Sequence, residues 1–184
     1  MSGFAIDFSF IARLEGACVT QGYVPDVIHS RSGVTLATGF DLGQRQASDL
    51  AALGLSCELQ QLLTPYVGVK GAAAVEVLRK QPLQISAAQA QQLDQAFKQP
   101  FIATLARDYL AASGVDFTAL PGAMQTVIAS VAFQYGNLAR RTPHFWQQVV
   151  HGDWPGAWAT LNRFGDRYPS RRQREAALLK AALA

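Results

Sequence analysis

One stretch of this chain, residues 17–45, differs in composition from the rest and restricts the fold more than any other feature. It interleaves glycine and proline with valine, threonine, tyrosine and phenylalanine. Runs of β-branched and aromatic residues between turn-forming residues are typical of short β-strands. Within it, "SGVTLATGFDLG" at residues 32–43 has the pattern of a β-hairpin with a single aspartate in it. The sequence therefore predicts one small β-containing lobe near the N-terminus.

Helical patterns dominate on both sides of this stretch. Residues 2–15 carry apolar side chains at helical spacing and predict an amphipathic helix that ends at Gly16. A long helix is predicted to begin at Ser86, where S-A-A-Q forms a capping box, and to bend near Pro100. Further on, "GAMQTVIASVAFQYG" is apolar nearly all round, which is typical of a central buried helix.

These patterns predict an α+β, mainly α, fold in a single domain of residues 1–184. The β-containing lobe is expected to cover about residues 16–50. The helical lobe is expected to cover about residues 51–184, together with the N-terminal helix 2–15.

The composition excludes several classes of protein. The 184 residues have a net charge of +3, which suits a polyanionic partner, but the chain has no nucleic-acid recognition motif. Cys18 and Cys57 lack the C-x-x-C spacing of zinc sites, and free thiols are favoured over a disulfide. No run approaches the ~20 apolar residues of a membrane span, and the N-terminus lacks the basic region of a signal peptide.

Glu15 stands out because it ends a mostly apolar helix directly before a glycine. The negative end of the helix dipole opposes ionisation of a carboxylate there, and a general acid must hold its proton until it reacts. The alternative is an ordinary exposed glutamate at a helix end.

Several motifs, in the same order along the chain, give it a resemblance to a known family. "FIARLEG" followed by "SGVTLATGFDLG" resembles the pesticin-like branch of the phage-type lysozymes, in which a helix ending in Glu-Gly precedes a hairpin that carries a threonine. "VAFQYGN", "GDWPGAWATLNRF" and "YPSRRQRE" are similar to later motifs of that family. The resemblance spans residues 11–174 and implies a lysozyme-like fold with the active-site cleft between the two lobes.

The resemblance also implies roles for individual residues. Glu15 matches the general acid, Thr35 the threonine that holds the attacking water, and Asp41 the aspartate of the pesticin-like pattern T-x-x-x-G-x-D. Coliphage members place the aspartate before the threonine, where Asp26 lies, but the pattern favours Asp41. Gly39 and Gly43 are expected to leave room for a sugar chain.

Three further residues are expected to bind substrate or support the site. Arg171 matches the arginine that pairs with the catalytic glutamate. Gln134 either lines the cleft or is a satisfied core amide, and Phe40 lies on the hairpin beside Asp41.

The implied activity is that of a muramidase, which cleaves the β-1,4 bond between N-acetylmuramic acid and N-acetylglucosamine in peptidoglycan. No cofactor or metal is expected, because acid, base and water suffice for glycoside hydrolysis. The alternative is a catalytically silent murein-binding module on the same fold.

The remaining expectations concern where the protein acts and with what partners. The chain is expected to be a monomer that is made in the cytoplasm without a signal peptide. It would reach peptidoglycan in the periplasm or cell wall as an endolysin, a bacteriocin or a secreted effector. For a toxin, an immunity protein that plugs the cleft is a further expected partner.

Overall fold

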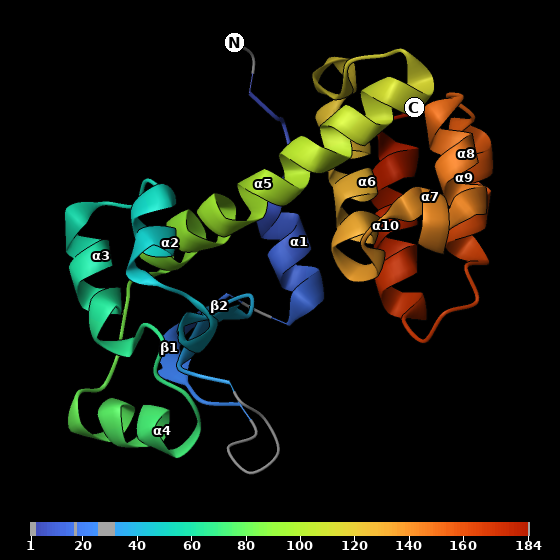
Figure 1. The fold of residues 1–184 in the computed structure, drawn as a ribbon. Helices are drawn as coiled ribbons and strands as arrows, with labels where there is room; N and C mark the ends of the chain where they lie inside the picture. The colour runs from blue at the N-terminus through green and yellow to red at the C-terminus, as the bar shows by residue number, and fades with distance from the viewer. Residues whose placement is uncertain (1–2, 17, 26–31, 184) are drawn as a thin grey trace. The chain divides into compact units, whose positions relative to one another are not determined.

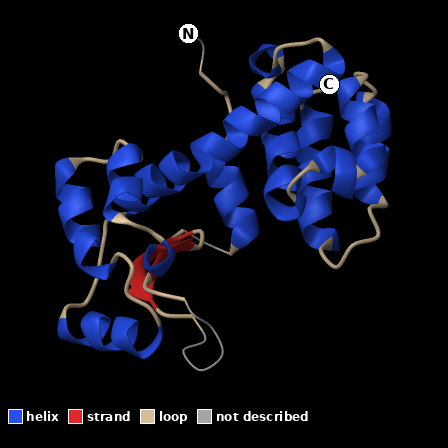
Figure 2. Ribbon diagram, in the orientation of Figure 1, coloured by secondary structure: helices blue, strands red, loops and turns tan. Residues whose placement is uncertain are grey.

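The computed structural model describes residues 3–16, 18–25 and 32–183 and shows an α+β, mainly α, lysozyme-like fold (Figures 1 and 2). The strands are β1 (Val19–Tyr23), β2 (Thr35–Ala37) and β3 (Phe40–Asp41). The α-helices are α1 (Phe8–Glu15), α2 (Ala47–Ala52), α3 (Cys57–Leu63), α4 (Gly71–Lys80), α5 (Ala87–Ser113), α6 (Gly122–Tyr135), α7 (Leu138–Arg141), α8 (Pro143–Val150), α9 (Trp154–Asn162) and α10 (Pro169–Ala181). Short 3-10 helices cover Leu42–Gln44 (η1), Thr64–Tyr66 (η2) and Phe117–Ala119 (η3). No described helix is both long and apolar enough to cross a membrane.

The first helix is shorter than the sequence suggested. It begins at Phe8, because the Asp7 carboxylate accepts the backbone N–H of Phe10 at 2.8 Å and so caps the first turn. The preceding residues are not helical, since the N–H groups of Ala5 and Asp7 donate to side chains of α6 at 2.9 and 2.8 Å. The helix ends as predicted, with Gly16 at a φ of +97°.

The three strands form one antiparallel sheet in the order β1-β2-β3. In the hairpin of β2 and β3, Thr35 pairs with Asp41 and Leu36 pairs with Phe40. The N–H of Gly39, at a φ of +106°, donates to the carbonyl of Leu36 at 3.1 Å and closes the turn. Thr35 and Asp41 therefore share one face of the sheet, because they are paired across the two strands of the hairpin.

The chain divides into two compact units by its internal contacts. One contains α1 as far as Leu14 together with Pro100–Ala184, and the other contains Glu15–Gln99. The β-containing unit thus extends well beyond the expected limit near residue 50. The reason is packing: apolar residues of the sheet and η1 share one buried cluster with residues of α3, η2 and α5, including Leu36, Phe40, Leu42, Leu59, Leu63, Tyr66 and Leu93. That residues 1–184 form one domain stays a prediction.

Helix α5 contributes to both units. Its start is the predicted capping box, in which Ser86 N–H donates to Gln89 Oε1 at 2.8 Å and Gln89 N–H donates to Ser86 Oγ at 3.1 Å. The helix continues through Pro100, and the division between the units falls at this residue. A proline lacks the N–H that would bond to the preceding turn, so the helix is weakest there.

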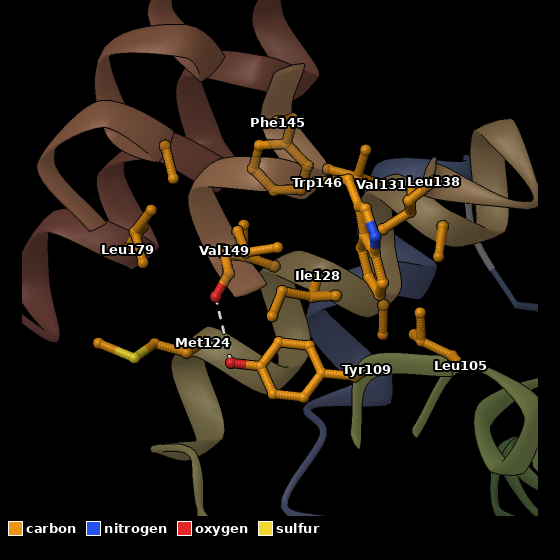
Figure 3. Packing of buried hydrophobic residues seen from close by; sticks show 14 of the residues in the cluster. Leu105, Tyr109, Met124, Ile128, Val131, Leu138, Phe145, Trp146, Val149 and Leu179 are labelled. Atoms are coloured by element: carbon orange, nitrogen blue, oxygen red, sulfur yellow. Dashed lines mark hydrogen bonds between the residues drawn. The ribbon is translucent and has the colours of Figure 1, made fainter. Parts of the chain in front are cut away.

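The helical unit is built round α6, as the apolar pattern predicted. Every residue from Met124 to Ala132 is buried. Figure 3 shows Ile128 and Val131 of this helix among apolar side chains of α5 and α8, and Tyr109 donates its hydroxyl to the carbonyl of Val149 at 3.1 Å. Burial on all sides explains why α6 has no polar face.

Candidate active site

Glu15 is the last residue of α1, and its carboxylate forms an ion pair with Lys98 of α5. The distance from Lys98 Nζ to Glu15 Oε2 is 3.0 Å. The side chain of Glu15 is 20% exposed, whereas that of Lys98 is only 5% exposed. Glu15 is therefore not the ordinary exposed helix-end residue that the sequence left open: one of its oxygens is held by a buried cation.

Lys98 has a second carboxylate partner one turn earlier on the same helix. Asp94 Oδ2 lies 2.9 Å from Lys98 Nζ, and the Asp94 side chain is 3% exposed. The hydroxyl of Thr38, at the tip of the β2–β3 hairpin, donates to Asp94 Oδ1. A continuous series of polar contacts thus runs from the hairpin through Asp94 and Lys98 to Glu15.

The charges of Asp94 and Lys98 also affect the pKa of the Cys18 thiol. Burial raises the pKa of Cys18, the Asp94 carboxylate raises it further, and the Lys98 ammonium lowers it. Both Cys18 and Cys57 are free thiols, as favoured from the sequence.

Thr35 and Asp41 face each other across the hairpin, but both are engaged with neighbouring backbone. Thr35 is 4% exposed and donates its hydroxyl to the carbonyl of Gly33 at 3.3 Å. Asp41 Oδ1 accepts the N–H groups of Gly33 at 2.9 Å and Gly43 at 2.8 Å, and so caps η1. Both bonds to Asp41 use Oδ1. The hairpin therefore holds the Asp41 carboxylate in one orientation.

The expected role of Gly43 needs correction. A Cβ on Gly43 would lie 2.6 Å from Gly33 Cα and 2.7 Å from the carbonyl oxygen of Val69, so this glycine packs against backbone and leaves no room for a sugar. Gly39, in contrast, has no heavy atom within 4 Å of a built Cβ. Close backbone packing at Gly33 and Gly43 is what brings both N–H groups to one Asp41 oxygen.

Phe40 is a core residue of the β-containing unit. It is 1% exposed, its ring centroid lies 5.2 Å from that of Phe97, and the Arg45 guanidinium lies 4.9 Å from its centroid. Burial removes its ring from contact with a ligand in this conformation, so Phe40 supports the hairpin. Asp26, the alternative second carboxylate, lies outside the described residues.

Arg171 lies on α10 in the helical unit and is bound there by α6. Its Nη2 donates to the carbonyl and the hydroxyl oxygen of Ser130 at 3.0 and 3.1 Å, and its Nε lies 3.2 Å from Glu175 Oε1. These bonds fix the guanidinium relative to α6. Its pairing with Glu15, a residue of the other unit, stays a prediction.

A buried ionic cluster that the sequence did not reveal surrounds Arg171. Glu175 and Arg172 are 0% and 1% exposed and bind each other, and Arg172 Nε also lies 2.9 Å from Asp166 Oδ2. Burial and the neighbouring Asp166 raise the pKa of Tyr135 to about 12. Burial alone would raise the pKa of Asp166, but hydrogen bonds from Tyr135 and Arg172 outweigh it and lower that pKa.

Gln134 lies in the last turn of α6, next to this cluster in sequence. Its Oε1 is buried and accepts no hydrogen bond from the part of the chain that the structure describes. It is therefore not the satisfied core amide of the alternative interpretation. Its expected place in a cleft stays a prediction.

Sequence reasoning missed Lys98, Asp94 and Thr38. The spacing of Asp94 and Lys98, four residues apart on a predicted helix, is typical of an exposed ion pair. Only the folded structure shows that both side chains are buried and that Lys98 also forms an ion pair with Glu15.

The described residues also include a sizeable cavity in the helical unit. Among the described residues, no three His, Cys, Asp or Glu side chains are grouped as metal ligands. A cavity of about 550 Å³ in the helical unit is lined by Arg141, His144, Gln148 and Arg163 with several apolar residues. The residues assigned to the site from the sequence are not among its lining.

A family model matches most of the chain. It is described as "Pesticin: Bacterial toxin homologue of phage lysozyme, C-term", and it matches residues 5–155. No curated protein matches the chain. Glu15, Thr35, Asp41, Asp94 and Lys98 all lie within the matched residues. The chain therefore belongs to the pesticin family of bacterial toxin homologues of phage lysozyme.

Proposed function

We propose that this protein is a peptidoglycan muramidase that hydrolyses the β-1,4 bond between N-acetylmuramic acid and N-acetylglucosamine. The chain belongs to a family of phage-lysozyme homologues, and one observation on its structure supports this proposal most directly. The Glu15 carboxylate ends α1 with one oxygen held 3.0 Å from buried Lys98, while a fifth of its side chain stays accessible. A general acid needs such a fixed and accessible carboxyl group.

In the proposed reaction, Glu15 gives its proton to the glycosidic oxygen as the bond from that oxygen to the anomeric carbon breaks. A water molecule held by Asp41 and Thr35 attacks the anomeric carbon, and its proton passes to Asp41. Asp41 then gives its proton to solvent and Glu15 takes one from solvent, which restores both carboxyl groups for the next cycle. The two N–H bonds to Asp41 Oδ1 support this role, because they hold the carboxylate in one orientation.

The direct test is release of reducing sugar ends from purified peptidoglycan. The muramidase should release them and clear the suspension. The competing function, a silent murein-binding module, would sediment with peptidoglycan and release none. A protein that binds without cleaving would overturn the proposal.

We expect Asp41→Asn to lose most activity and Asp26→Asn to lose little. Asparagine keeps an Oδ1 that accepts the N–H groups of Gly33 and Gly43, so the hairpin should stay folded while the charge is lost. Loss of a general base should lower the rate of hydrolysis by about 10²–10⁴-fold. The initial rate of reducing-end release measures both variants. The reverse result would assign the second carboxylate to Asp26.

We also expect the enzyme to invert the anomeric configuration and release the α-anomer first. A water held between an acid and an opposing carboxylate attacks directly, because a threonine hydroxyl forms no ready glycosyl-enzyme. Proton NMR of the fresh reducing end, recorded before mutarotation, distinguishes the anomers. A β-anomer as first product would mean retention and would make Asp41 a nucleophile.

The family description supports an antibacterial role, and we propose that peptidoglycan in the periplasm or cell wall is the site of action. The net charge of +3 would help to hold the protein on anionic murein, so binding should weaken with added salt. A cleft-blocking immunity protein is the partner that we propose for a toxin of this kind.

A further inference from the structure

The cavity of about 550 Å³ in the helical unit is lined by none of the residues that have a role in the proposed reaction. Its lining comes from α7, α8 and α9 and from the segments that follow α7 and α9. All of these residues lie between Pro100 and Ala184, so the cavity is formed within one unit. Its volume is within the range of sites that bind small molecules.

Two aromatic side chains of the lining are held in place by the core. Phe145 of α8 is 1% exposed, and its ring centroid lies 6.3 Å from that of Phe164. The ring of Phe164 also packs on Tyr135, with 5.7 Å between the centroids, and the Arg172 guanidinium lies 4.7 Å from its centroid. An apolar surface that is already ordered lowers the entropy cost of binding a ligand.

The cavity also has an excess of positive charge. Arg141 at the end of α7 and Arg163 directly after α9 line it, and both are exposed and therefore accessible from solvent. No aspartate or glutamate is among the lining residues. Within the part of the chain that the structure describes, neither arginine forms an ion pair. The lining therefore offers two guanidinium groups without a counter-ion.

The acidic residues that are close in sequence to the lining are engaged elsewhere. Asp153 caps α9, because its Oδ1 accepts the N–H of Gly156 at 2.9 Å. Asp166 Oδ2 accepts from Arg172 Nε at 2.9 Å and from the Tyr135 hydroxyl at 2.6 Å. Their contacts leave the positive charge of the cavity for a ligand to balance.

We propose that this cavity binds a small organic anion, with its carboxylate or phosphate group at Arg141 and Arg163 and its apolar body against Phe145 and Phe164. A planar guanidinium can donate two parallel hydrogen bonds to either anionic group. This site goes beyond the proposed muramidase function and does not rest on it. Free organic acids and phosphates carry this chemistry, and so do the carboxylates of peptidoglycan peptides.

The experiment is a ligand titration of the whole chain, followed by proton–nitrogen correlation NMR of the backbone amides in α7–α9. The probes are hexanoate, hexyl phosphate, the neutral hexanamide and the free peptide stem of peptidoglycan. The anions should shift the amides of the lining residues until saturation, with a dissociation constant of about 1 mM. Hexanamide should bind about 5-fold or more weakly, because it lacks the charge.

Three variants each remove one arginine charge from the helical unit. Arg141→Gln and Arg163→Gln should each weaken hexanoate binding by up to about 5-fold and leave hexanamide binding unchanged. The matched control is Arg167→Gln, because Arg167 is also exposed but does not line the cavity. This control should bind hexanoate as the wild type does.

The outcomes separate the two sources of the anion from failure of the proposal. Tighter binding of the peptide stem than of hexanoate or hexyl phosphate would identify peptidoglycan as the source, and equal or weaker binding would identify a free small anion. No saturable shift with any of the three anions, or equal binding of hexanoate and hexanamide, would overturn the proposal. Equal losses in Arg163→Gln and Arg167→Gln would do so as well. None of these measurements uses the release of reducing ends, so they are independent of whether the protein cleaves peptidoglycan.

Discussion

Glu15→Gln should abolish lysis and leave the fold intact. Glutamine keeps the length of the side chain and a carbonyl oxygen that can accept from Lys98, but it has no proton to give to the leaving oxygen. Lys98 keeps Asp94 as its counter-ion, so the substitution leaves no unpaired buried charge. Loss of general acid catalysis should lower the rate of reducing-end release by about 10²–10⁴-fold.

The matched control is Glu58→Gln, the same substitution at an exposed position in the first turn of α3. It should lyse peptidoglycan at the wild-type rate, and circular dichroism should give the same melting temperature for the wild type and both variants within a few degrees. A folded Glu15→Gln protein that clears peptidoglycan as fast as the wild type would remove Glu15 from the mechanism.

Glu175→Ala should cause the largest loss of stability. The Glu175 carboxylate is 0% exposed and accepts hydrogen bonds from Ser130, Arg171 and Arg172. Its removal leaves Arg172, which is 1% exposed, with Asp166 as its remaining carboxylate partner. Breaking a buried ion pair in this way costs about 3–5 kcal/mol in the free energy of unfolding. For a chain of this size the melting temperature should fall by roughly 10 °C.

Arg174→Ala, one residue earlier on the exposed face of α10, provides the comparison. It should change the free energy of unfolding by less than about 0.5 kcal/mol. Urea unfolding followed by circular dichroism measures both. Equal stability of the two variants would show that the cluster of Glu175 and the two arginines contributes little to the fold.

Several features could be predicted because they depend on neighbours in sequence. The residues around Ser86 and Gln89 form a capping box wherever a helix starts there, and the structure confirms it. The all-round apolar pattern of 122–136 predicted the buried α6, and Gly16 ended α1 because it adopts a positive φ. Glu15 was placed at a helix end by the same local reasoning.

Other features depend on contacts between distant parts of the chain. The first helix starts at Phe8 because backbone groups of Ala5 and Asp7 bond to α6, about 120 residues away. Phe40 is buried and Gly43 packs on Gly33 and Val69 because α3, η2 and α5 join the β-containing unit. No local pattern predicts such partners.

The sequence by itself determined the α+β class, the single small sheet, the order of the motifs and the carboxylate before Gly16, since these follow from local propensity and periodicity. Only the tertiary structure decided what surrounds that carboxylate. Lys98 and Asp94 have the spacing of an exposed pair on a helix, and folding buries them beside Glu15 and Thr38. Burial removes the solvent that would screen their charges, so these contacts are stronger than those of an exposed ion pair on a helix.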